Sequence, residues 1–456
     1  MYTTAVSPLR IGERLLNARK VFVTDAASDW WKRRYAPGSA MAVVLAYTSP
    51  AIGHLFPFCA LLTELASRGH RVHVRTLHAG VDLCRQLGFT AERVDPRIES
   101  LQSRDWTTGS ALRVVSKTIE VLARRAAIEV ADLDGAIRRV NPDVVLVDAN
   151  CWGAISAAET QQIPWLVFSP FIPYLDSPGS PPFGPGAPPR PGWAGRVRDS
   201  GMRAVTAAIF DRPLRAGINP VRAALGLAPV RSADELLRRA PGVLVATGKP
   251  FEYAHTEWGE SVHLIGPAIF EPPSQGPPGW LDDIDLPVVL VTTSSVRQRD
   301  TALVHTALRA LGGEPVHIVA THPAGASGID TSPYRHATLT GFIPHSAVLD
   351  RAICVVTHGG MGITQKALSR GIPVCAVPFG RDQFEVARRV EIAEAGTRLP
   401  AGRLTVRRLR QKVLSAMTMT TGAEAVAAGF AANGGMRHGA NVVERQLGVP
   451  SRRHRT

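Results

Sequence analysis

Short apolar runs alternate with segments of helical periodicity along most of the chain, and this alternation predicts an α/β fold. Most of the runs are continuously apolar, which is typical of parallel strands buried on both faces. We expect strands at 42–47, 71–76, 144–147, 242–247, 287–291, 316–320, 337–340, 353–356 and 374–377. Because strand and helix alternate in the same way in both halves, the pattern favours two Rossmann-like domains.

The clearest helical segment follows the first predicted strand. Apolar residues recur at helical spacing over 58–67, and Gly69 ends the segment. Further helices are expected at about 197–209, 233–239 and 363–370, and an amphipathic segment at 423–446 closes the chain. Residues 176–195 are too rich in proline and glycine for regular structure, so they predict a long surface loop.

A break in composition separates the two halves. Residues 266–286 are polar and rich in proline, unlike the segments on either side, and we expect them to form an interdomain linker. The predicted domains are then 41–265 and 287–445, followed by a basic tail at 446–456. Residues 1–40 lack the apolar core of a secretory signal. They are either an extension upstream of a start at Met41 or an arm on the surface.

Composition narrows the class of protein. The chain has 456 residues, 45% of them hydrophobic and 20% charged, without an apolar run long enough to span a membrane. Its five cysteines lack metal-binding spacing, which predicts reduced thiols and a cytoplasmic location. The formal net charge is +14, but no basic stripe or motif indicates nucleic-acid binding. The basic tail is most simply solvated, with weak association with an anionic membrane surface as the alternative.

Candidate chemistry is concentrated in residues 353–383. There an apolar strand ends in Thr357-His358-Gly359-Gly360, a helical segment follows, and Gly371-Ile372-Pro373 leads into the next strand. The glycines allow a sharp turn, and the free N–H groups at the start of the helix favour an anion. The sequence therefore predicts an anion site beside His358, although an ordinary βαβ unit with a tight turn is the simpler alternative.

This stretch resembles the donor-binding signature of family-1 glycosyltransferases, the UDP-glycosyltransferase-like branch of the GT-B fold. The pattern His-Gly-Gly-x-Gly, then Gly-Ile-Pro and Asp382-Gln383, is similar above all to the bacterial enzymes that glycosylate macrolides and other natural products. The resemblance extends more weakly over 41–445, and it implies two Rossmann-like domains whose parallel sheets face each other across a cleft. This chain departs from the pattern at Ile363, where the family has Ser, Thr or Asn, and at Lys366, where many members have Glu.

The resemblance implies a site for a nucleoside-diphosphate sugar in the second domain. Asp382 and Gln383 would bind the hexose hydroxyls, and Phe342 would stack on the nucleotide base, although a plain core phenylalanine fits it equally well. A glutamate at position 366 would accept hydrogen bonds from the ribose, which lysine cannot do; Lys366 would instead direct its charge at the diphosphate. The full expected donor set is Ser294, Ser295, Phe342, Ile343, His358, Gly359, Gly360, Gly362, Ile363, Thr364, Lys366, Asp382 and Gln383.

Two residues of the first domain are the candidate catalytic pair. His54 lies between the first predicted strand and the first helix, and Asp148 ends a buried strand, where α/β proteins bind ligands. Each residue also has an ordinary alternative as a helix-capping group. By resemblance to the acceptor-side Gly-His-x-x-Pro loop of the family, His54 would be the general base and Asp148 would orient it.

The expected activity is therefore inverting transfer of a hexose from a dTDP- or UDP-sugar to a hydroxyl of a hydrophobic small molecule such as a polyketide. We expect no cofactor and no metal, because a histidine, backbone N–H groups and a helix end suffice to bind the diphosphate. A non-catalytic sugar-nucleotide-binding relative that assists another protein is the main alternative, and a sugar-nucleotide epimerase is a weaker one. The sequence is compatible with a monomer or a homodimer.

Overall fold

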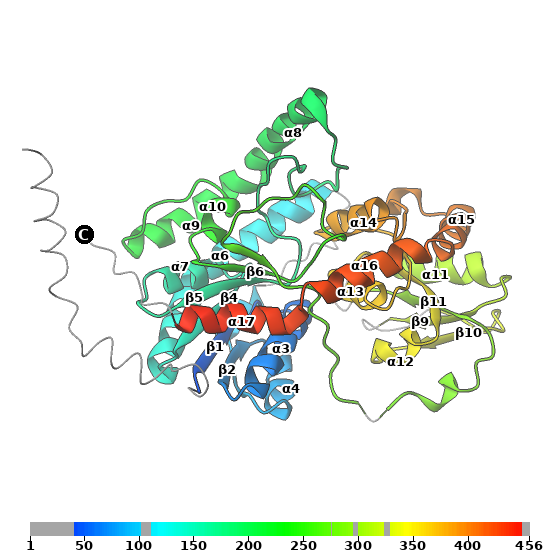
Figure 1. The fold of residues 1–456 in the computed structure, drawn as a ribbon, viewed down its shortest axis with the longest axis horizontal. Helices are drawn as coiled ribbons and strands as arrows, with labels where there is room; N and C mark the ends of the chain where they lie inside the picture. Colours follow the sequence, from blue (N-terminus) through cyan, green and yellow to red (C-terminus); the bar gives the residue numbers. More distant parts are fainter. Residues whose placement is uncertain (1–40, 102–110, 275, 295–299, 323–328, 449–456) are drawn as a thin grey trace, which may run out of the picture. The chain divides into compact units, whose positions relative to one another are not determined.

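The predicted strands form two parallel β-sheets (Figure 1). The computed structural model describes residues 41–101, 111–274, 276–294, 300–322 and 329–448. The predicted extension 1–40, Ser295 and residues 449–456 of the predicted tail lie outside the described residues. Residues 1–42 and 43–456 separate into two units, and the architecture below is that of the second.

The first sheet has seven strands in the order β3-β2-β1-β4-β5-β6-β7. Their bounds are β1 Val43–Tyr47, β2 Arg71–Thr76, β3 Thr90–Arg93, β4 Val144–Asp148, β5 Trp165–Ser169, β6 Val243–Val245 and β7 Val262–Leu264. The sequence predicted that the strand at 242–247 would be the last of this domain, which is wrong. The edge strand β7 was not predicted, because it is short and half-buried and contains His263, and therefore lacks a continuous apolar run.

Helices cover both faces of this sheet. They are α3 Ile52–Ser67, α4 Val81–Gln86, α5 Pro96–Ser100, α6 Ala111–Val140, α7 Trp152–Glu159, α8 Gly192–Thr206, α9 Arg212–Ala224 and α10 Ala233–Leu237. Short turns of 3-10 helix at His78–Gly80 and of π-helix at Ala207–Asp211 accompany them. Helices α6, α7, α9 and α10 share one hydrophobic core with alternate residues of the strands, such as Leu45 and Val145. On the opposite face, Phe58 of α3 contacts Phe168 of β5 with ring centroids 4.4 Å apart.

The second sheet has six strands in the order β10-β9-β8-β11-β12-β13. They are β8 Val288–Thr292, β9 His317–Thr321, β10 Ala337–Thr340, β11 Ala352–Thr357, β12 Val374–Ala376 and β13 Gly396–Arg398. Its helices are α11 Thr301–Leu311, α12 His345–Leu349, α13 Met361–Leu368, α14 Gln383–Ile392, α15 Val406–Met417 and α16 Thr420–Ala432. Short 3-10 turns lie at Gly279–Leu281 and Ala401–Arg403. Helices α11 and α15 pack on one face, and α12, α13, α14 and α16 pack on the other.

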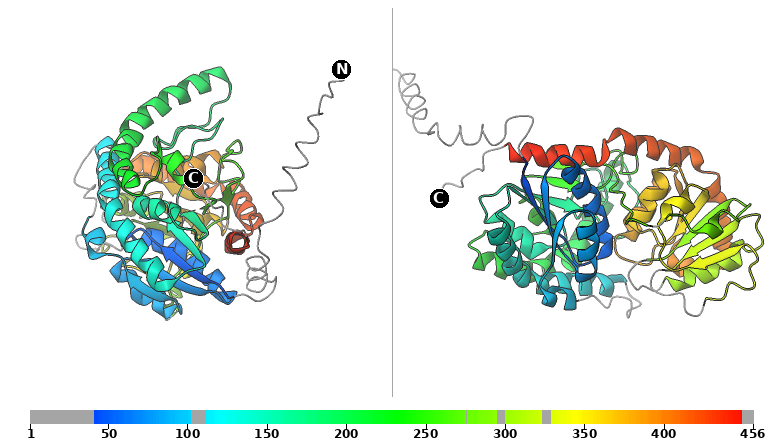
Figure 2. Two further views of the ribbon diagram at one scale, coloured as in Figure 1. Left: turned by 90° about the vertical axis from the view of Figure 1, so that its left-hand side faces the viewer. Right: turned by 90° about the horizontal axis from the view of Figure 1, so that it is seen from below.

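The final amphipathic segment divides into α16 and α17 Gly435–Leu447, because Gly434 adopts a left-handed conformation with φ 76°. Whereas α16 packs on the second domain, α17 packs on α3 of the first, and Figure 2 shows the two red helices following one another along the molecule. Arg68, which directly follows α3, donates hydrogen bonds to Asn441 (2.6 Å) and Glu444 (2.7 Å) of α17. The sequence predicted that residues up to 445 belong to the second domain. No local sequence pattern indicates that the chain returns to the first domain.

Both sheets have a topological switch point next to candidate site residues. Strand β1 lies between β2 and β4, and β8 lies between β9 and β11. The chain leaves the carboxyl ends of these central strands in opposite directions, which opens a crevice in each sheet. His54 and Asp148 follow or end β1 and β4, and Ser294 and His358 follow β8 and β11.

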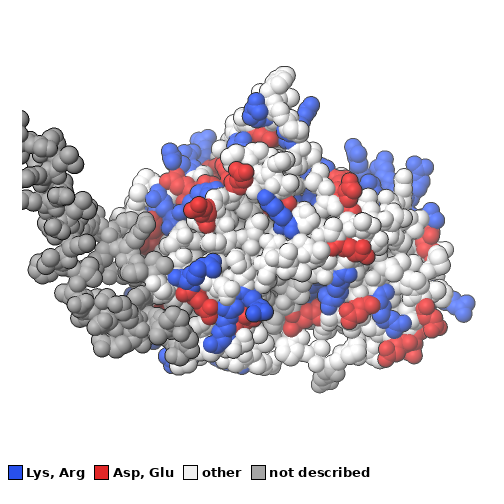
Figure 3. All heavy atoms as spheres, viewed as in Figure 1, with Lys and Arg blue, Asp and Glu red and all other residues white. Residues whose placement is uncertain are grey.

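The charge of the chain is dispersed where its surface is visible. On the face drawn in Figure 3, lysine and arginine side chains are interspersed with aspartate and glutamate rather than gathered into one band. Across the described part of the chain, no helix combines the length and apolar character needed to cross a membrane.

Candidate active site

A cavity of about 950 Å³ is lined by residues from both domains. Its walls include the loops after β1 and β4 in the first domain and the loops after β8 and β11 in the second. The residues expected from the sequence that line it are His54, Ser294, Phe342, Ile343, His358, Gly360, Gly362, Ile363, Lys366, Asp382 and Gln383.

His54 and Asp148 form a hydrogen-bonded pair in the first domain. The imidazole Nδ1 lies 2.8 Å from Asp148 Oδ2, and the Asp148 side chain is fully buried. Asp148 Oδ1 accepts a second hydrogen bond from the backbone N–H of Asn150 at 2.8 Å, which fixes the carboxylate. Because an ionised carboxylate only accepts hydrogen bonds, Nδ1 carries a proton, and in the neutral form of this imidazole the lone pair is on Nε2. The pair can therefore act as an oriented base.

The position of His54 depends on an earlier helix start than the sequence predicted. The expected helix began after Pro57, whereas α3 begins at Ile52 and contains Pro57. His54 therefore lies in the first turn of α3, where backbone N–H groups need no intrahelical partner. Its ring also contacts Phe171 edge to face, with centroids 5.6 Å apart. These contacts hold the imidazole at the cavity wall.

Aromatic side chains form the wall of the cavity around His54. Phe171 contacts Tyr174 with ring centroids 5.3 Å apart, and Tyr174 contacts Phe183 and Phe210, each at 4.7 Å. The Tyr174 hydroxyl donates to Asn150 Oδ1 at 3.3 Å. Burial raises the pKa of Tyr174, and the charges of Asp382 and Asp148 raise it further. The phenol is therefore a neutral hydrogen-bonding group.

The glycine turn after β11 depends on a close approach of its backbone to His358. Gly359 has φ 85°, which requires glycine, and a Cβ on Gly360 would lie 2.4 Å from His358 Nε2. His358 is 8% exposed. Burial lowers its pKa, against the opposing effects of Asp300 and a backbone hydrogen bond at Thr292. Burial thus favours the neutral imidazole, which has a single N–H group and lies at the N-terminus of α13.

The hydroxyl-rich loop and the aromatic segment of the second domain lie at the cavity as expected. The Ser294 N–H donates to Asp300 Oδ2 at 2.6 Å, and Ser294, Thr292 and Thr293 line the cavity. Phe342 is 53% exposed and Ile343 is buried. A plain core role for Phe342 is therefore wrong, and its ring face is open to a ligand.

Asp382 and Gln383 are at the start of α14. Burial raises the pKa of Asp382, while its own backbone N–H, His54 and Arg381 oppose the change. His54 of the first domain and Asp382 of the second line the same cavity. Gln383 Oε1 accepts from the backbone N–H groups of Phe379 (2.9 Å) and Gly380 (3.1 Å), so it also holds its own loop.

Lys366 has a partner that the sequence did not reveal. Its Nζ lies 3.1 Å from Glu271 Oε1, which belongs to the predicted linker. Glu271 also accepts from the Ser346 N–H at 3.0 Å and the Ser346 hydroxyl at 2.5 Å. Burial lowers the pKa of Lys366, and Glu271 partly offsets it. The lysine charge is therefore directed at Glu271, contrary to the expectation that it would be directed at a diphosphate.

Two residues of the expected donor set lie behind the cavity wall. Gly359 forms the turn, and its Cα faces the backbone of Gln383. Thr364 is fully buried, and its hydroxyl oxygen has no hydrogen-bond partner within the described part of the chain. A role for Thr364 as a donor to the ligand therefore requires a rearrangement of α13.

Several cavity residues were not expected from the sequence. Arg381 adjoins Asp382 and adopts a positive φ of 58°, an uncommon conformation for a non-glycine residue. His345 follows the Phe342-Ile343-Pro344 segment, and burial lowers its pKa to about 4, helped by the charge of Lys366. Arg381 and His345 could have been predicted, because each is adjacent in sequence to a motif identified in the sequence. Glu271, Tyr174 and Phe171 lie outside any motif, so only the fold brings them to the cavity.

Comparison with known proteins identifies a matching family model and several relatives of similar sequence. Residues 306–443 match the family model described as "Erythromycin biosynthesis protein CIII-like, C-terminal domain". The chain is 31% identical over 387 residues to 4'-demethylrebeccamycin synthase of Lentzea aerocolonigenes, covering 82% of this chain and 91% of the relative. It is 25% identical over 423 residues to demethyllactenocin mycarosyltransferase of Streptomyces fradiae, covering 89% and 86%.

Solved structures share the architecture. The glycosyltransferase VinC, crystallised in complex with dTDP, superposes with a TM-score of 0.63 at 22% identity, over 89% of this chain and 99% of VinC. At that identity the likeness concerns the fold. It confirms the expected pair of parallel-sheet domains.

Proposed function

Because the chain belongs to the family of natural-product glycosyltransferases with the GT-B fold, we propose that it transfers a hexose with inversion from a nucleoside-diphosphate sugar to a hydrophobic small molecule. The observation that carries this proposal is the shared cavity, in which the His54–Asp148 pair faces His358 and the N-terminus of α13. One side offers a base for an acceptor and the other offers N–H groups for a diphosphate.

In the proposed reaction His54 removes the proton of the acceptor hydroxyl. The proton moves to Nε2, the acceptor oxygen forms a bond to C1 of the sugar, and the bond from C1 to the phosphate oxygen breaks. The electron pair leaves with the nucleoside diphosphate. Asp148, whose Oδ2 lies 2.8 Å from Nδ1 and accepts a hydrogen bond from its N–H group, stabilises the imidazolium as it forms. Attack from the face opposite the leaving group inverts C1.

Charge that develops on the leaving diphosphate is met by preorganised donors. The neutral His358 imidazole and the first N–H groups of α13, at Met361 and Gly362, line this part of the cavity. Such groups stabilise a developing anion without reorganising during the reaction. Asp382 would accept hydrogen bonds from the sugar hydroxyls.

The aromatic wall of the cavity favours a hydrophobic acceptor with flat or bulky rings. Phe171, Tyr174, Phe183 and Phe210 form a continuous set of ring contacts beside His54. Aromatic rings stack on flat apolar ligands and exclude water from them. An alcohol or phenol of a polyketide or a related aromatic natural product suits this wall.

A cytoplasmic location remains a prediction that rests on the five buried free cysteines.

Donor-dependent product formation tests this function. The protein is incubated with dTDP-glucose or UDP-glucose and a panel of phenols and polyketide alcohols that includes 4-methylumbelliferone. We expect mass spectrometry to detect a hexose added to an acceptor, equimolar release of nucleoside diphosphate, and NMR coupling constants that show an inverted anomeric centre. Nucleotide binding without any product would instead support the non-catalytic alternative, and retention at C1 would contradict direct displacement by the acceptor.

Activity should survive an excess of EDTA. The physical reason is that His358, backbone N–H groups and the N-terminus of α13 supply the positive potential that a cation supplies elsewhere. The measurement is the initial rate before and after chelation, followed by addition of magnesium or manganese. A rate abolished by EDTA and restored by either ion would contradict the proposed mechanism.

The donor preference is expected to favour deoxythymidine over uridine. Lys366 donates but does not accept hydrogen bonds, and Glu271 already accepts from Lys366 and Ser346. A donor without a 2′-hydroxyl therefore loses less at this site. One hydrogen bond contributes about 0.5–1.5 kcal/mol, so we expect a preference for dTDP-glucose of about 2- to 10-fold in direct competition with UDP-glucose.

A charge exchange tests the cause of that preference. Lys366→Glu alone would place a second carboxylate beside Glu271, so the informative variant is Glu271→Lys combined with Lys366→Glu, which restores the ion pair. We expect this double variant to shift the preference towards UDP-glucose, and Glu271→Gln serves as a control that removes the pair. A strong wild-type preference for UDP-glucose that the exchange leaves unchanged would overturn the assignment of Lys366.

A further inference from the structure

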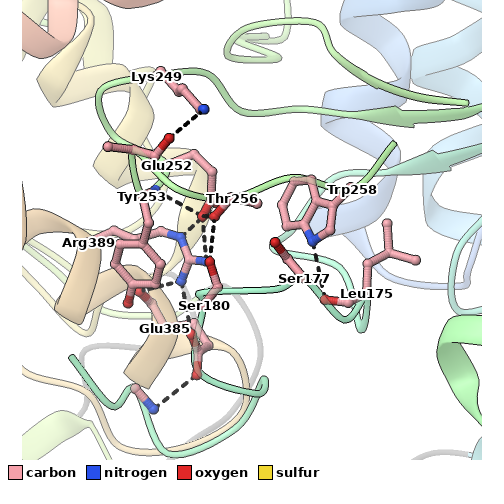
Figure 4. A network of polar contacts seen from close by, with 12 residues as sticks. Leu175, Ser177, Ser180, Lys249, Glu252, Tyr253, Thr256, Trp258, Glu385 and Arg389 are labelled. Atoms are coloured by element: carbon pink, nitrogen blue, oxygen red, sulfur yellow. Dashed lines mark hydrogen bonds and ion pairs between the residues drawn. The ribbon is translucent and has the colours of Figure 1, made fainter. Parts of the chain in front are cut away.

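A buried charge cluster joins helix α14 to the first domain (Figure 4). Arg389 of α14 donates from Nε and Nη2 to the two carboxylate oxygens of Glu252, at 2.8 Å each. Its Nη1 donates to Glu385 Oε2, one turn earlier on α14, at 2.9 Å. The exposed fractions of the Arg389, Glu252 and Glu385 side chains are 5%, 0% and 2%. The proposed reaction gives these three charged groups no role.

The first-domain end of the cluster is anchored by its own neighbours. Glu252 Oε1 also accepts from the Tyr253 N–H and from the Thr256 hydroxyl, both at 3.0 Å. The Thr256 hydroxyl lies 3.0 Å from the hydroxyl of Ser180, which belongs to the loop 176–195. The Arg389 guanidinium packs over the Tyr253 ring at 4.2 Å from its centroid. Glu252 is thus held rigidly, as a fixed point for Arg389.

The other end of the cluster holds the proline- and glycine-rich loop directly. Glu385 Oε1 accepts from the backbone N–H groups of Gly184 (2.8 Å) and Gly186 (2.9 Å). Arg388 Nε donates to the Gly186 carbonyl at 2.7 Å. A Cβ on Gly186 would lie 2.2 Å from the carbonyl oxygen of Phe384, so the loop is in direct backbone contact with α14.

Residues 183–186 of this loop, here called the acceptor clamp, contribute to the cavity. Phe183, Gly184 and Pro185 line it, and Phe183 contacts Tyr174 in the wall around His54. Helix α14 begins at Gln383, directly after Asp382. The same short helix therefore carries the candidate sugar ligand at its N-terminus and the support for the acceptor wall on its first two turns.

We propose that Arg389 is a positioning residue: through Glu385 it fixes the position of the acceptor clamp relative to Asp382. The acceptor site then has its correct shape only when α14 is in place. The proposal rests on the proposed function and adds to it a physical link between acceptor binding and the donor-binding helix. Arg389 touches neither substrate. It acts through the ion pair with Glu385, which holds that carboxylate directed at the clamp amides.

The decisive variant loosens the clamp without altering any charge. In Gly186→Ala the new methyl group collides with the Phe384 carbonyl and must displace the clamp from α14. Gly179→Ala is the matched control, because Gly179 lies in the same loop with a positive φ of 79° but its Cβ would meet no described heavy atom closer than 3.8 Å. The control thus shares the backbone effect and lacks the collision.

Steady-state kinetics with dTDP-glucose and 4-methylumbelliferone separate the two substrates. For Gly186→Ala we expect the acceptor KM to rise about tenfold, as for an overpacked contact, with the donor KM and the slow hydrolysis of donor unchanged. Gly179→Ala should keep both KM values. Arg389→Met should raise the acceptor KM in the same way. Arg389→Lys should raise it less, since lysine keeps the positive charge but cannot donate hydrogen bonds to both carboxylates with the geometry of a guanidinium.

A purely structural role makes a different prediction. If the cluster only braces the fold, Arg389→Met would lower the melting temperature while Gly186→Ala left the acceptor KM of the active enzyme at the wild-type value. That result would overturn this proposal and leave the proposed function standing. Equal rises in the donor and acceptor KM would also overturn it, because the clamp would then not be specific for the acceptor. A wild type that forms no product from any donor would overturn both.

Discussion

Replacing His54 with alanine is expected to lower kcat by about 100- to 10,000-fold, the usual contribution of a general base. The imidazole is 2.8 Å from the buried Asp148 carboxylate and opens to the cavity, so the proton of the acceptor has no comparable oriented base after its removal. The proposed nucleotide site lies on the other domain, so binding of dTDP or UDP should remain nearly intact. Turnover and calorimetric titration of nucleotide measure the two quantities separately.

His54→Gln is the matched control for the structural effect of this change. Glutamine can keep a hydrogen bond to Asp148 and much of the side-chain volume, but its amide does not accept a proton at neutral pH. We expect the same loss of kcat as for alanine. A loss smaller than about fivefold in either variant would remove His54 from the role of base.

Gly360, in the glycine turn after β11 (here called the donor turn), and Gly362, in the first turn of α13, are expected to respond differently to alanine. Gly360→Ala places a methyl group 2.4 Å from His358 Nε2 and must displace that buried ring, so both the melting temperature and donor binding should fall. Overpacking costs about 1–3 kcal/mol, which corresponds to about a 5- to 150-fold weaker donor if the cost falls on the bound state.

Gly362→Ala separates the ligand from the fold. Its Cβ would meet no described heavy atom within 4 Å, because Gly362 faces the open cavity. Alanine stabilises a helix by about 0.5–1 kcal/mol relative to glycine, so the melting temperature should stay or rise while the KM for the donor increases about tenfold. Gly402→Ala, at another uncrowded glycine outside the cavity lining, is the control. A normal donor KM in Gly362→Ala would show that α13 does not face the nucleotide.

Local sequence patterns are sufficient to predict the architecture of each domain. Continuous apolar runs such as 144–147 and 353–356 favour strands with buried side chains, and they appear as β4 and β11 with bounds shifted by one residue, although Ile353 is exposed. The glycine turn after β11 is also a local matter, because the positive φ of Gly359 and the contact between Gly360 and His358 involve neighbours in the chain. Such features depend on a few consecutive residues, so they can be predicted without knowledge of the fold.

The start of α3 shows where local rules fail. The apolar spacing predicted a helix from residue 58, yet α3 begins at Ile52, contains Pro57 and buries Leu55 ahead of that proline. Burial of an apolar face outweighs the single backbone hydrogen bond that proline cannot donate. The same preference for burial returns α17 to α3 at the end of the chain.

The sequence by itself determined the two α/β domains, the donor turn and the candidates His54 and Asp148, because each depends on residue type and short spacing. Only the tertiary structure decided which distant groups meet: Glu271 beside Lys366 and Tyr174 beside Asn150 at the cavity, and Glu252 beside Arg389 outside the cavity lining. These contacts join segments separated by up to 137 positions. The physical reason is that pairing between distant charges depends on how two sheets are packed together, and periodicity within either sheet contains no information about that packing.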